Sequence, residues 1–275
     1  MSRQLRKTLV NLAGVGTLLV FAFPVYWMFA TAFKPSGDIL SYTPRFLPWP
    51  ITLQHFKDAV ARPHFLDYVR NSLLVTLGAV VLSLAIATLA ALAVGRFNFR
   101  GRKAYLLLVM IVQMAPFEAL LIPFFLTLRQ LDLLNRLPAL ILIYFIFTMP
   151  FTIWTLRGFV MAVPRELEEA AMVDGCSRLQ AFMRVVFPLL APGLVATSIF
   201  AFVTAWNEYL YAFVFMRDAD KFTLPVWLGT FKTAFGTDWG GTMAASALFT
   251  LPVLVFFLAI QRRLASGLAA GAVKG

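Results

Sequence analysis

Two carboxylates stand out because each lies inside a long, otherwise uncharged stretch of the chain. Glu118 interrupts residues 104–128, and Glu208 interrupts residues 185–216. An ionised side chain at the middle of a membrane costs roughly 2.5–3.5 kcal/mol on insertion scales, so such residues usually face protein or water and mark a path for ions or polar solutes. The two positions therefore predict polar groups on a path through an apolar protein.

Enzymatic chemistry has little support in the sequence. The apolar stretches offer two separated acids and no histidine, which argues against a Ser-His-Asp or paired-carboxylate hydrolase. Neither the nucleotide-binding pattern G-x-x-x-x-G-K-[ST] nor G-x-G-x-x-G occurs. His55 and His64 lack a second set of metal ligands. We expect no catalytic residue, no metal site and no cofactor bound by this chain.

The composition indicates that lipid surrounds most of the chain. Apolar residues make up 60% and charged residues 13%, against about 25% charged residues in soluble domains. Six apolar segments can each supply the roughly 20 residues that cross about 30 Å of hydrocarbon as a helix; they are residues 9–33, 71–95, 104–128, 137–157, 190–214 and 239–261. The first is too long for the apolar part of a cleaved signal peptide. The expected fold is an all-α membrane protein with six transmembrane helices, forming one domain over residues 1–275.

The distribution of basic residues predicts the topology. With a cytoplasmic N-terminus, more than half of the 24 Lys and Arg residues fall in the inside segments, as the positive-inside rule requires. Both termini are then cytoplasmic, including the tail at 262–275. The net charge of +11 is explained by residues at membrane flanks, which serve topology and contact anionic lipid. A nucleic-acid partner is not expected.

The longest predicted cytoplasmic loop, residues 164–188, contains the most acidic part of the chain. Pro164 suits a first helical position, and the glutamates that follow favour the positive end of a helix dipole. Asp174-Gly175 is typical of a helix stop. The segment therefore begins with one short helix.

A second short helix is predicted directly after this stop. Ser177 followed three residues later by Gln180 is a capping-box start. Apolar residues then recur at helical spacing up to Pro188, at Leu179, Phe182, Met183 and Val186. Such a helix pair could lie on lipid headgroups. The acidic first helix and the small residues Ala170 and Ala171 instead favour docking of another protein.

This loop resembles the EAA loop in the transmembrane permease subunits of ABC importers. The resemblance rests on Glu169-Ala170-Ala171, Asp174-Gly175, Phe182, Pro188 and Pro192. The family commonly has alanine where this chain has Cys176, a small-for-small difference. The resemblance implies that residues Glu169, Ala170, Ala171, Asp174, Gly175, Phe182 and Pro188 couple the membrane part to an ATPase.

Further motifs are similar to those of the carbohydrate permeases of the maltose-importer type. They are Phe33-Lys34-Pro35, Asn71-Ser72, Trp206-Asn207-Glu208-Tyr209 and the glycine-rich tail that contains Gly271 and Lys274. The resemblance implies a homologous second permease, two copies of an ATPase that holds ATP and magnesium, and an extracytoplasmic sugar-binding protein. It also implies a bacterial or archaeal cell (inner) membrane and a tail that reaches towards the ATPase.

The sequence offers polar and aromatic candidates for a sugar path. Pro116 and Pro123 flank Glu118, so the third transmembrane helix should be broken there, with its freed carbonyl groups facing protein or a water-filled cavity. The other candidates are Gln113, Trp154, Asn207 and Glu208. For Glu208, an alternative interpretation is an interfacial residue within a belt of aromatic side chains.

Two alternative functions remain at this point. An ABC importer of another solute, such as a glycerol phosphate ester, a polyamine or an amino acid, would carry the same loop. A proton-coupled secondary transporter would use Glu118 and Glu208 as proton sites; an internal repeat would favour it, and no convincing repeat is seen.

Overall fold

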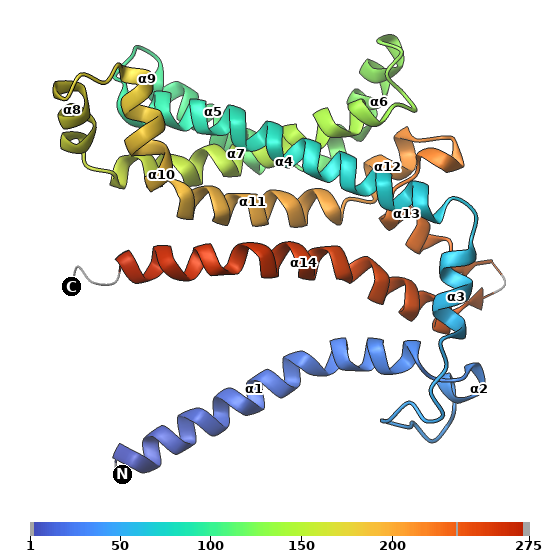
Figure 1. The fold of residues 1–275 in the computed structure, drawn as a ribbon. Coiled ribbons are helices and arrows are strands. Elements are labelled where there is room, and N and C mark those ends of the chain that lie inside the picture. The colour runs from blue at the N-terminus through green and yellow to red at the C-terminus, as the bar shows by residue number, and fades with distance from the viewer. Residues whose placement is uncertain (1–2, 235, 272–275) are drawn as a thin grey trace. The chain divides into compact units, whose positions relative to one another are not determined.

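The structure is a computed structural model that describes residues 3–234 and 236–271, with side-chain positions for Gln4, residues 7–234 and residues 236–261. The regular secondary structure of the described part is helical except for one pair of two-residue strands. Its elements are α1 (Arg3–Ala32), α2 (Ser36–Ile39), α3 (Gln54–Ala61), α4 (Phe65–Arg96), α5 (Arg102–Met114), η1 (Phe117–Leu120), α6 (Leu121–Gln130), α7 (Leu137–Ala162), α8 (Arg165–Val173), α9 (Arg178–Ala181), η2 (Phe182–Val186), α10 (Phe187–Leu189), α11 (Ala191–Trp206), α12 (Leu210–Phe215), η3 (Ala219–Lys221), α13 (Leu224–Gly229), β1 (Lys232–Thr233), β2 (Gly236–Thr237) and α14 (Trp239–Gly271) (Figure 1).

Four of these helices are long and apolar enough to cross a membrane: the segments Lys7–Ala32, Phe65–Arg96, Leu137–Ala162 and Trp239–Gln261. Two further candidates are bent pairs, Arg102–Met114 with Phe117–Gln130 at 91°, and Arg178–Leu189 with Ala191–Trp206 at 68°. The described chain therefore holds four to six candidate spans. The expectation of an all-α membrane fold is confirmed at that level.

The expected fifth span, residues 190–214, is interrupted in the structure. α11 ends at Trp206, and α12 begins at Leu210 after a short break. At the other end, the axis bends at Leu190, between two prolines that cannot donate a backbone hydrogen bond. The apolar run alone gave no sign of the break at Asn207, because hydropathy does not report helix continuity.

The chain divides into two compact units. The first comprises residues up to Phe65 and residues Trp227–Pro252. In it, the Phe33-Lys34-Pro35 motif ends α1: the Phe33 carbonyl accepts from the Thr52 amide at 2.9 Å, and the Lys34 carbonyl accepts from His55 Nε2 at 3.0 Å. The Lys34 ammonium lies 3.9 Å from the centre of the Trp27 ring, and burial lowers its pKa, opposed by Asp38. The motif thus fixes where the first apolar helix stops.

The second unit comprises Leu66–Val226 and the chain from Val253 onward. Within it α7 packs against both α4 and α11. A Cβ atom at Gly95 would lie 2.6 Å from Val160 Cγ1, and one at Gly193 would lie 2.6 Å from the Phe159 ring. Small residues at such crossings permit the close packing on which helix association in a membrane depends. These contacts hold α4 and α11 against α7.

The Asn71-Ser72 motif anchors the loop that follows α12. Asn71 Nδ2 donates to the carbonyl oxygens of Asp220 and Phe222 at 2.8 and 3.0 Å, and Ser72 Oγ accepts from the Leu224 amide at 2.7 Å. Buried backbone groups need such partners because they are shielded from water. The motif therefore ties the start of α4 to η3 and α13 across a long sequence separation.

Candidate functional site

The helix pair predicted at residues 164–188 is present, and its turn is closed by backbone hydrogen bonds. The Gly175 amide donates to Met172 O at 3.1 Å, and the Cys176 amide donates to Ala171 O at 3.0 Å. These two bonds form a Schellman motif, which needs a left-handed residue after the helix. Gly175 supplies it, with φ of 91°. The first helix, α8, thus ends at the predicted stop.

The second helix starts with the predicted capping box. The Gln180 amide donates to Ser177 Oγ at 3.3 Å, and the Ser177 amide donates to Gln180 Oε1 at 2.8 Å. Each bond satisfies a backbone donor that the first helical turn leaves free. The turn between α8 and α9 is therefore capped on both sides, and its shape is set by local residues.

The helix after this cap contains a π turn, which the sequence did not predict. In η2 the Phe187 amide donates to the Phe182 carbonyl, five residues earlier, which is the π-helical spacing. Pro188 follows at once and has no amide to donate. We call residues Arg165–Leu189 the hairpin. The Phe182 side chain is buried in the core with Val186 and Leu190, so this residue fastens the hairpin to α7 and α4.

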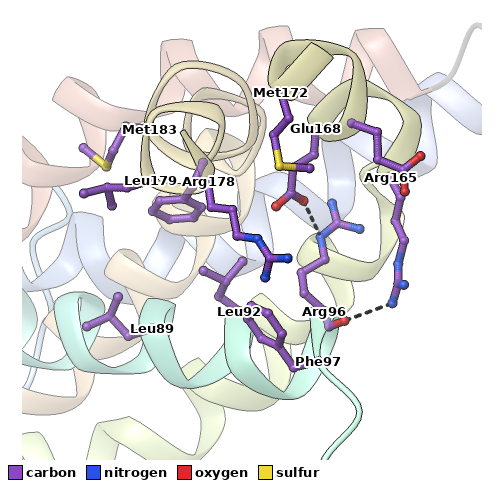
Figure 2. A pocket seen from close by; sticks show the side chains of 12 residues that line it. Leu89, Leu92, Arg96, Phe97, Arg165, Glu168, Met172, Arg178, Leu179 and Met183 are labelled. Carbon is purple, nitrogen blue, oxygen red and sulfur yellow. Dashed lines mark hydrogen bonds and ion pairs between the residues drawn. The ribbon is translucent and has the colours of Figure 1, made fainter. Parts of the chain in front are cut away.

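Two contacts from α8 attach the hairpin to the end of α4 (Figure 2). Glu168 Oε2 lies 3.4 Å from Arg96 Nε, and these side chains are 22% and 7% exposed. Arg165 Nη2 donates to the Arg96 carbonyl oxygen at 3.1 Å. That carbonyl belongs to the last residue of α4, where helices leave carbonyl groups free and a cation is favourable. The ion pair and the hydrogen bond fix the position of α8 relative to α4.

A cavity of about 460 Å³ lies between this hairpin and the end of α4 (Figure 2). Its walls are mostly apolar, and the basic side chains Arg96, Arg165 and Arg178 lie at it with Glu168 and Glu169. On the hairpin itself, Val173 is 87% exposed and Leu179 is 70% exposed. These two apolar side chains are open to contact by another molecule.

The predicted coupling residues divide between the surface and the interior of the hairpin. Exposed members are Glu169, Ala170, Asp174, Gly175 and Pro188, while Ala171 is half-buried and Phe182 is buried. The first five can be reached by another protein, and the last is placed to support the hairpin from within.

The two breaks at the predicted path acids meet within the second unit. Glu118 lies in the 3-10 turn η1 between α5 and α6, so the predicted break of the third span is confirmed. Tyr211 Oη donates to the Phe117 carbonyl at 2.6 Å, and its amide donates to Glu208 Oε1 at 2.8 Å. The Phe147 ring packs against both Phe117 and Tyr211. Tyr211 therefore joins the two discontinuities.

Glu208 is the N-terminal anchor of α12. Its Oε2 accepts from Tyr144 Oη at 2.6 Å and from the Ala212 amide at 3.2 Å, while Oε1 accepts from the Tyr211 amide. An acidic side chain at a helix start satisfies free amides and complements the helix dipole. The neighbouring Asn207 is exposed, and its Nδ2 donates to the Val203 carbonyl at 2.8 Å.

The remaining path candidates take no part in the hydrogen bonds of Glu208 described above. Gln113 on α5, Glu118 on η1 and Trp154 on α7 are all exposed. The Trp154 ring centre lies 5.6 Å from Arg157 Cζ. Of the predicted tail residues, Gly271 is the last residue of α14, and Lys274 lies outside the described residues.

Sequence reasoning missed Arg96, Arg165 and Tyr144. The two arginines entered only as topology charges, although Arg96 follows directly on an apolar run and precedes a loop. Tyr144 lies in a run without charged residues, and no local signal links it to Glu208. Such pairings depend on tertiary structure.

The chain combines several apolar spans, two of them broken, with an exposed helical hairpin. These are features of a membrane transport component. The comparisons identify the family. The model described as binding-protein-dependent transport system inner membrane component matches residues 83–269. The chain belongs to this family of ABC importer permeases, which are multi-pass inner membrane proteins without catalytic activity of their own.

Relatives match almost the full length. The diacetylchitobiose uptake system permease protein DasC of Streptomyces coelicolor is 53% identical over 265 residues, 96% of each chain. The trehalose/maltose transport system permease protein MalG of Thermococcus litoralis is 32% identical over 274 residues, 98% of each chain. Among solved structures, a bacterial ABC transporter involved in import of the acidic polysaccharide alginate matches with a TM-score of 0.80 and 23% identity, covering 95% of this chain and 98% of that one. This last match supports the fold.

Proposed function

We propose that this chain forms half of the translocation path for a di- or oligosaccharide and that the hairpin couples the path to a separate ATPase. In this arrangement six spans cross the membrane and both termini are cytoplasmic. The partners are a homologous second permease, two copies of the ATPase and an extracytoplasmic sugar-binding protein. ATP and magnesium belong to the ATPase.

The observation that carries the proposal is the geometry of the hairpin. Its turn is closed by a Schellman motif and a capping box, its outer surface is small and apolar around Ala170 and Val173, and Phe182 roots it in the core. A rigid element with an exposed docking face can transmit the movement of a docked ATPase without deforming. The contacts of Glu168 and Arg165 with Arg96 then pass that movement to α4.

The mechanism that follows is alternating access. When the ATPase dimer closes, it moves the hairpins of the two permeases together. The helices attached to the hairpins then open the translocation path to the outside of the membrane. The binding protein then releases sugar into this path. The broken spans suit this movement, since a helix interrupted at η1 or at Asn207 can bend there at lower cost than a continuous one.

The substrate class rests on the relatives. DasC and MalG are named for uptake of diacetylchitobiose and of trehalose and maltose, which supports a sugar over a polyamine, an amino acid or a glycerol phosphate ester. Membership of the importer family removes the basis for a proton-coupled transporter acting alone. For the path itself we propose Gln113, Glu118, Trp154 and Asn207 as solute-facing groups, with Glu208 holding α12 in place beside them.

The coupling role is tested by Gly175→Asp. The substitution places a charged side chain on the docking surface and at a backbone conformation of φ 91° that L-residues rarely adopt. We expect the variant to insert and to assemble with the second permease, but to lose the ATPase during co-purification and to lose uptake.

The matched control is Gly236→Asp, another glycine at positive φ with open space around it and far from the hairpin in sequence. It should retain the ATPase. Equal retention of the ATPase by both variants, with normal uptake, would overturn the coupling role of the hairpin.

The substrate class is tested with the assembled importer and its binding protein in proteoliposomes. Uptake is measured for diacetylchitobiose, maltose and trehalose, with spermidine, glutamate and glycerol 3-phosphate as the competing classes. ATP-dependent uptake of a sugar alone supports the assignment, whereas uptake restricted to one of the other solutes refutes it and leaves the coupling role intact.

A further inference from the structure

A second cavity, separate from the hairpin, is lined by four cations and by no acid within the described residues. It has a volume of about 810 Å³, and its charged side chains are Arg100, Arg102, Lys103 and Arg157. The first three belong to the loop and first turn between α4 and α5, and the fourth comes from α7. A concave group of like charges is costly unless an anion occupies it.

Two features of the cavity fit a phosphate group. No side chain caps the first turn of α5 in the described structure, and the residue before that turn, Gly101, has φ of 91°. The start of a helix leaves amides free and favours negative charge. In addition, Arg157 Nε is buried and has no hydrogen-bond acceptor among the described residues, although the arginine lines the cavity.

The surroundings of the cavity select a lipid as the source of the phosphate. Beyond the basic first turn, α5 continues with exposed apolar side chains: Leu107, Leu108 and Ile111 are 59%, 57% and 56% exposed. The cavity lies at the basic end of this apolar helix, which is the end that meets headgroups when the helix enters a membrane. Basic pockets at such a level bind anionic headgroups, and the apolar surface of α5 offers a place for acyl chains.

We propose that this cavity, formed by the α4–α5 loop, the start of α5 and Arg157, binds the phosphate of an acidic glycerophospholipid. The bound phosphate accepts from the guanidinium groups of Arg102 and Arg157 and from the free amides of α5. The lipid would thereby fasten α5 to α7 at the membrane surface. The inference depends on the placement of α5 in the membrane and is independent of ATPase docking at the hairpin.

The test measures lipid retention by the assembled importer. Purified complex is incubated in micelles with equal amounts of phosphatidylglycerol and phosphatidylcholine of the same acyl chains, and bound lipid is counted by native mass spectrometry. We expect preferential retention of phosphatidylglycerol by the natural chain. Arg102→Gln with Arg157→Gln should lower it roughly ten-fold or more, since each basic residue near an anionic surface contributes about a five-fold factor.

The matched control changes two arginines in another basic cavity. Arg129 and Arg136 line it together with Arg217, but Asp132 is also present. Arg129→Gln with Arg136→Gln removes the same charge and should leave lipid retention unchanged. Labelling of Cys176, the single cysteine of the chain, from one side of sealed vesicles confirms that topology is the same in all variants. Should the test pair fail to assemble, Arg100→Gln, on an exposed loop residue, gives the same readout with a smaller effect.

Three results would overturn the proposal. Equal retention of the two lipids by the natural chain would remove the preference for an anion. Equal losses in test and control variants would show a general charge effect. Competition by glycerol 3-phosphate as strong as that by phosphatidylglycerol would show a site for free phosphate esters instead of lipid.

Discussion

Replacing Glu208 by glutamine tests whether a single carboxyl group holds the break between α11 and α12. Three donors converge on this side chain: the Tyr144 hydroxyl at 2.6 Å, the Tyr211 amide at 2.8 Å and the Ala212 amide at 3.2 Å. Together they use both carboxyl oxygens. Glutamine keeps the shape but offers one oxygen, so at least one donor must face an NH₂ group.

The expected cost follows from burial. The Tyr144 side chain is 2% exposed, and a buried donor without an acceptor costs about 1–3 kcal/mol. Glu208→Gln should therefore lower the free energy of unfolding by about 1–3 kcal/mol. Tyr144→Phe removes only one of the three bonds and leaves the two amides satisfied, so it should cost about 1 kcal/mol. Because the two residues contact each other, the double variant should lose less than the sum of the single losses.

The assay is a double-mutant cycle on the assembled importer, read by denaturant or thermal unfolding of this subunit, with sugar uptake in proteoliposomes as a second readout. We expect a coupling energy of about 1 kcal/mol between the two positions and several-fold slower uptake for Glu208→Gln while the complex still forms and hydrolyses ATP. A coupling energy below about 0.5 kcal/mol would refute the capping role. Natural uptake kinetics for Asn207→Ala would remove Asn207 from the proposed path, and natural kinetics for Glu208→Gln would show that uptake does not depend on the Glu208 carboxylate.

Three other changes address the hairpin and the loop after α12. Ala170→Phe should weaken ATPase co-purification more than membrane insertion, since Ala170 is exposed on α8; unchanged co-purification would contradict this. Arg96→Gln should lower stability by about 1–3 kcal/mol, because it leaves the partly buried Glu168 without its ion pair; Glu168→Gln should then cost little more in the same chain, and additive losses would argue against the pair. Hydrogen bonds from Lys221 and then Asn135 lower the pKa of Asp218 below its ordinary 3.8, so the stability that they add is present above pH 3.8 and is lost as the pH falls through the lowered pKa. Asp218→Asn should therefore flatten the acid limb of a thermal-stability profile, and identical acid limbs for the two proteins would contradict the assignment.

The hairpin was predictable because its signals are local. Gly175 at the stop and Ser177 with Gln180 at the restart act within one turn of helix, and the structure places each of them as expected. The break at Glu118 was also predictable, since two prolines flank it in sequence. Local chemistry of this kind does not depend on which other helices are nearby.

The role of Glu208 was not predictable in the same way. Burial depth and apolar length describe the average surroundings of a residue, whereas its partner Tyr144 lies 64 positions earlier in the chain. The π turn at η2 was missed for a similar reason: a proline predicts that one hydrogen bond is absent, but the helix can absorb that loss by widening its preceding turn, and the surrounding core decides whether it does.

The double cap of the hairpin makes part of it portable between permeases. Every hydrogen bond that closes the turn joins residues 170–180 to one another, so a graft of that segment would carry its bend into a different host. The tilt of α8 is not inherited with it, because the tilt depends on Arg96, which lies in another span. Chimeric importers that exchange the loop alone should therefore recognise the donor's ATPase yet hold it at the host's angle, and adding Arg96 or its equivalent to the exchange should restore the donor's geometry.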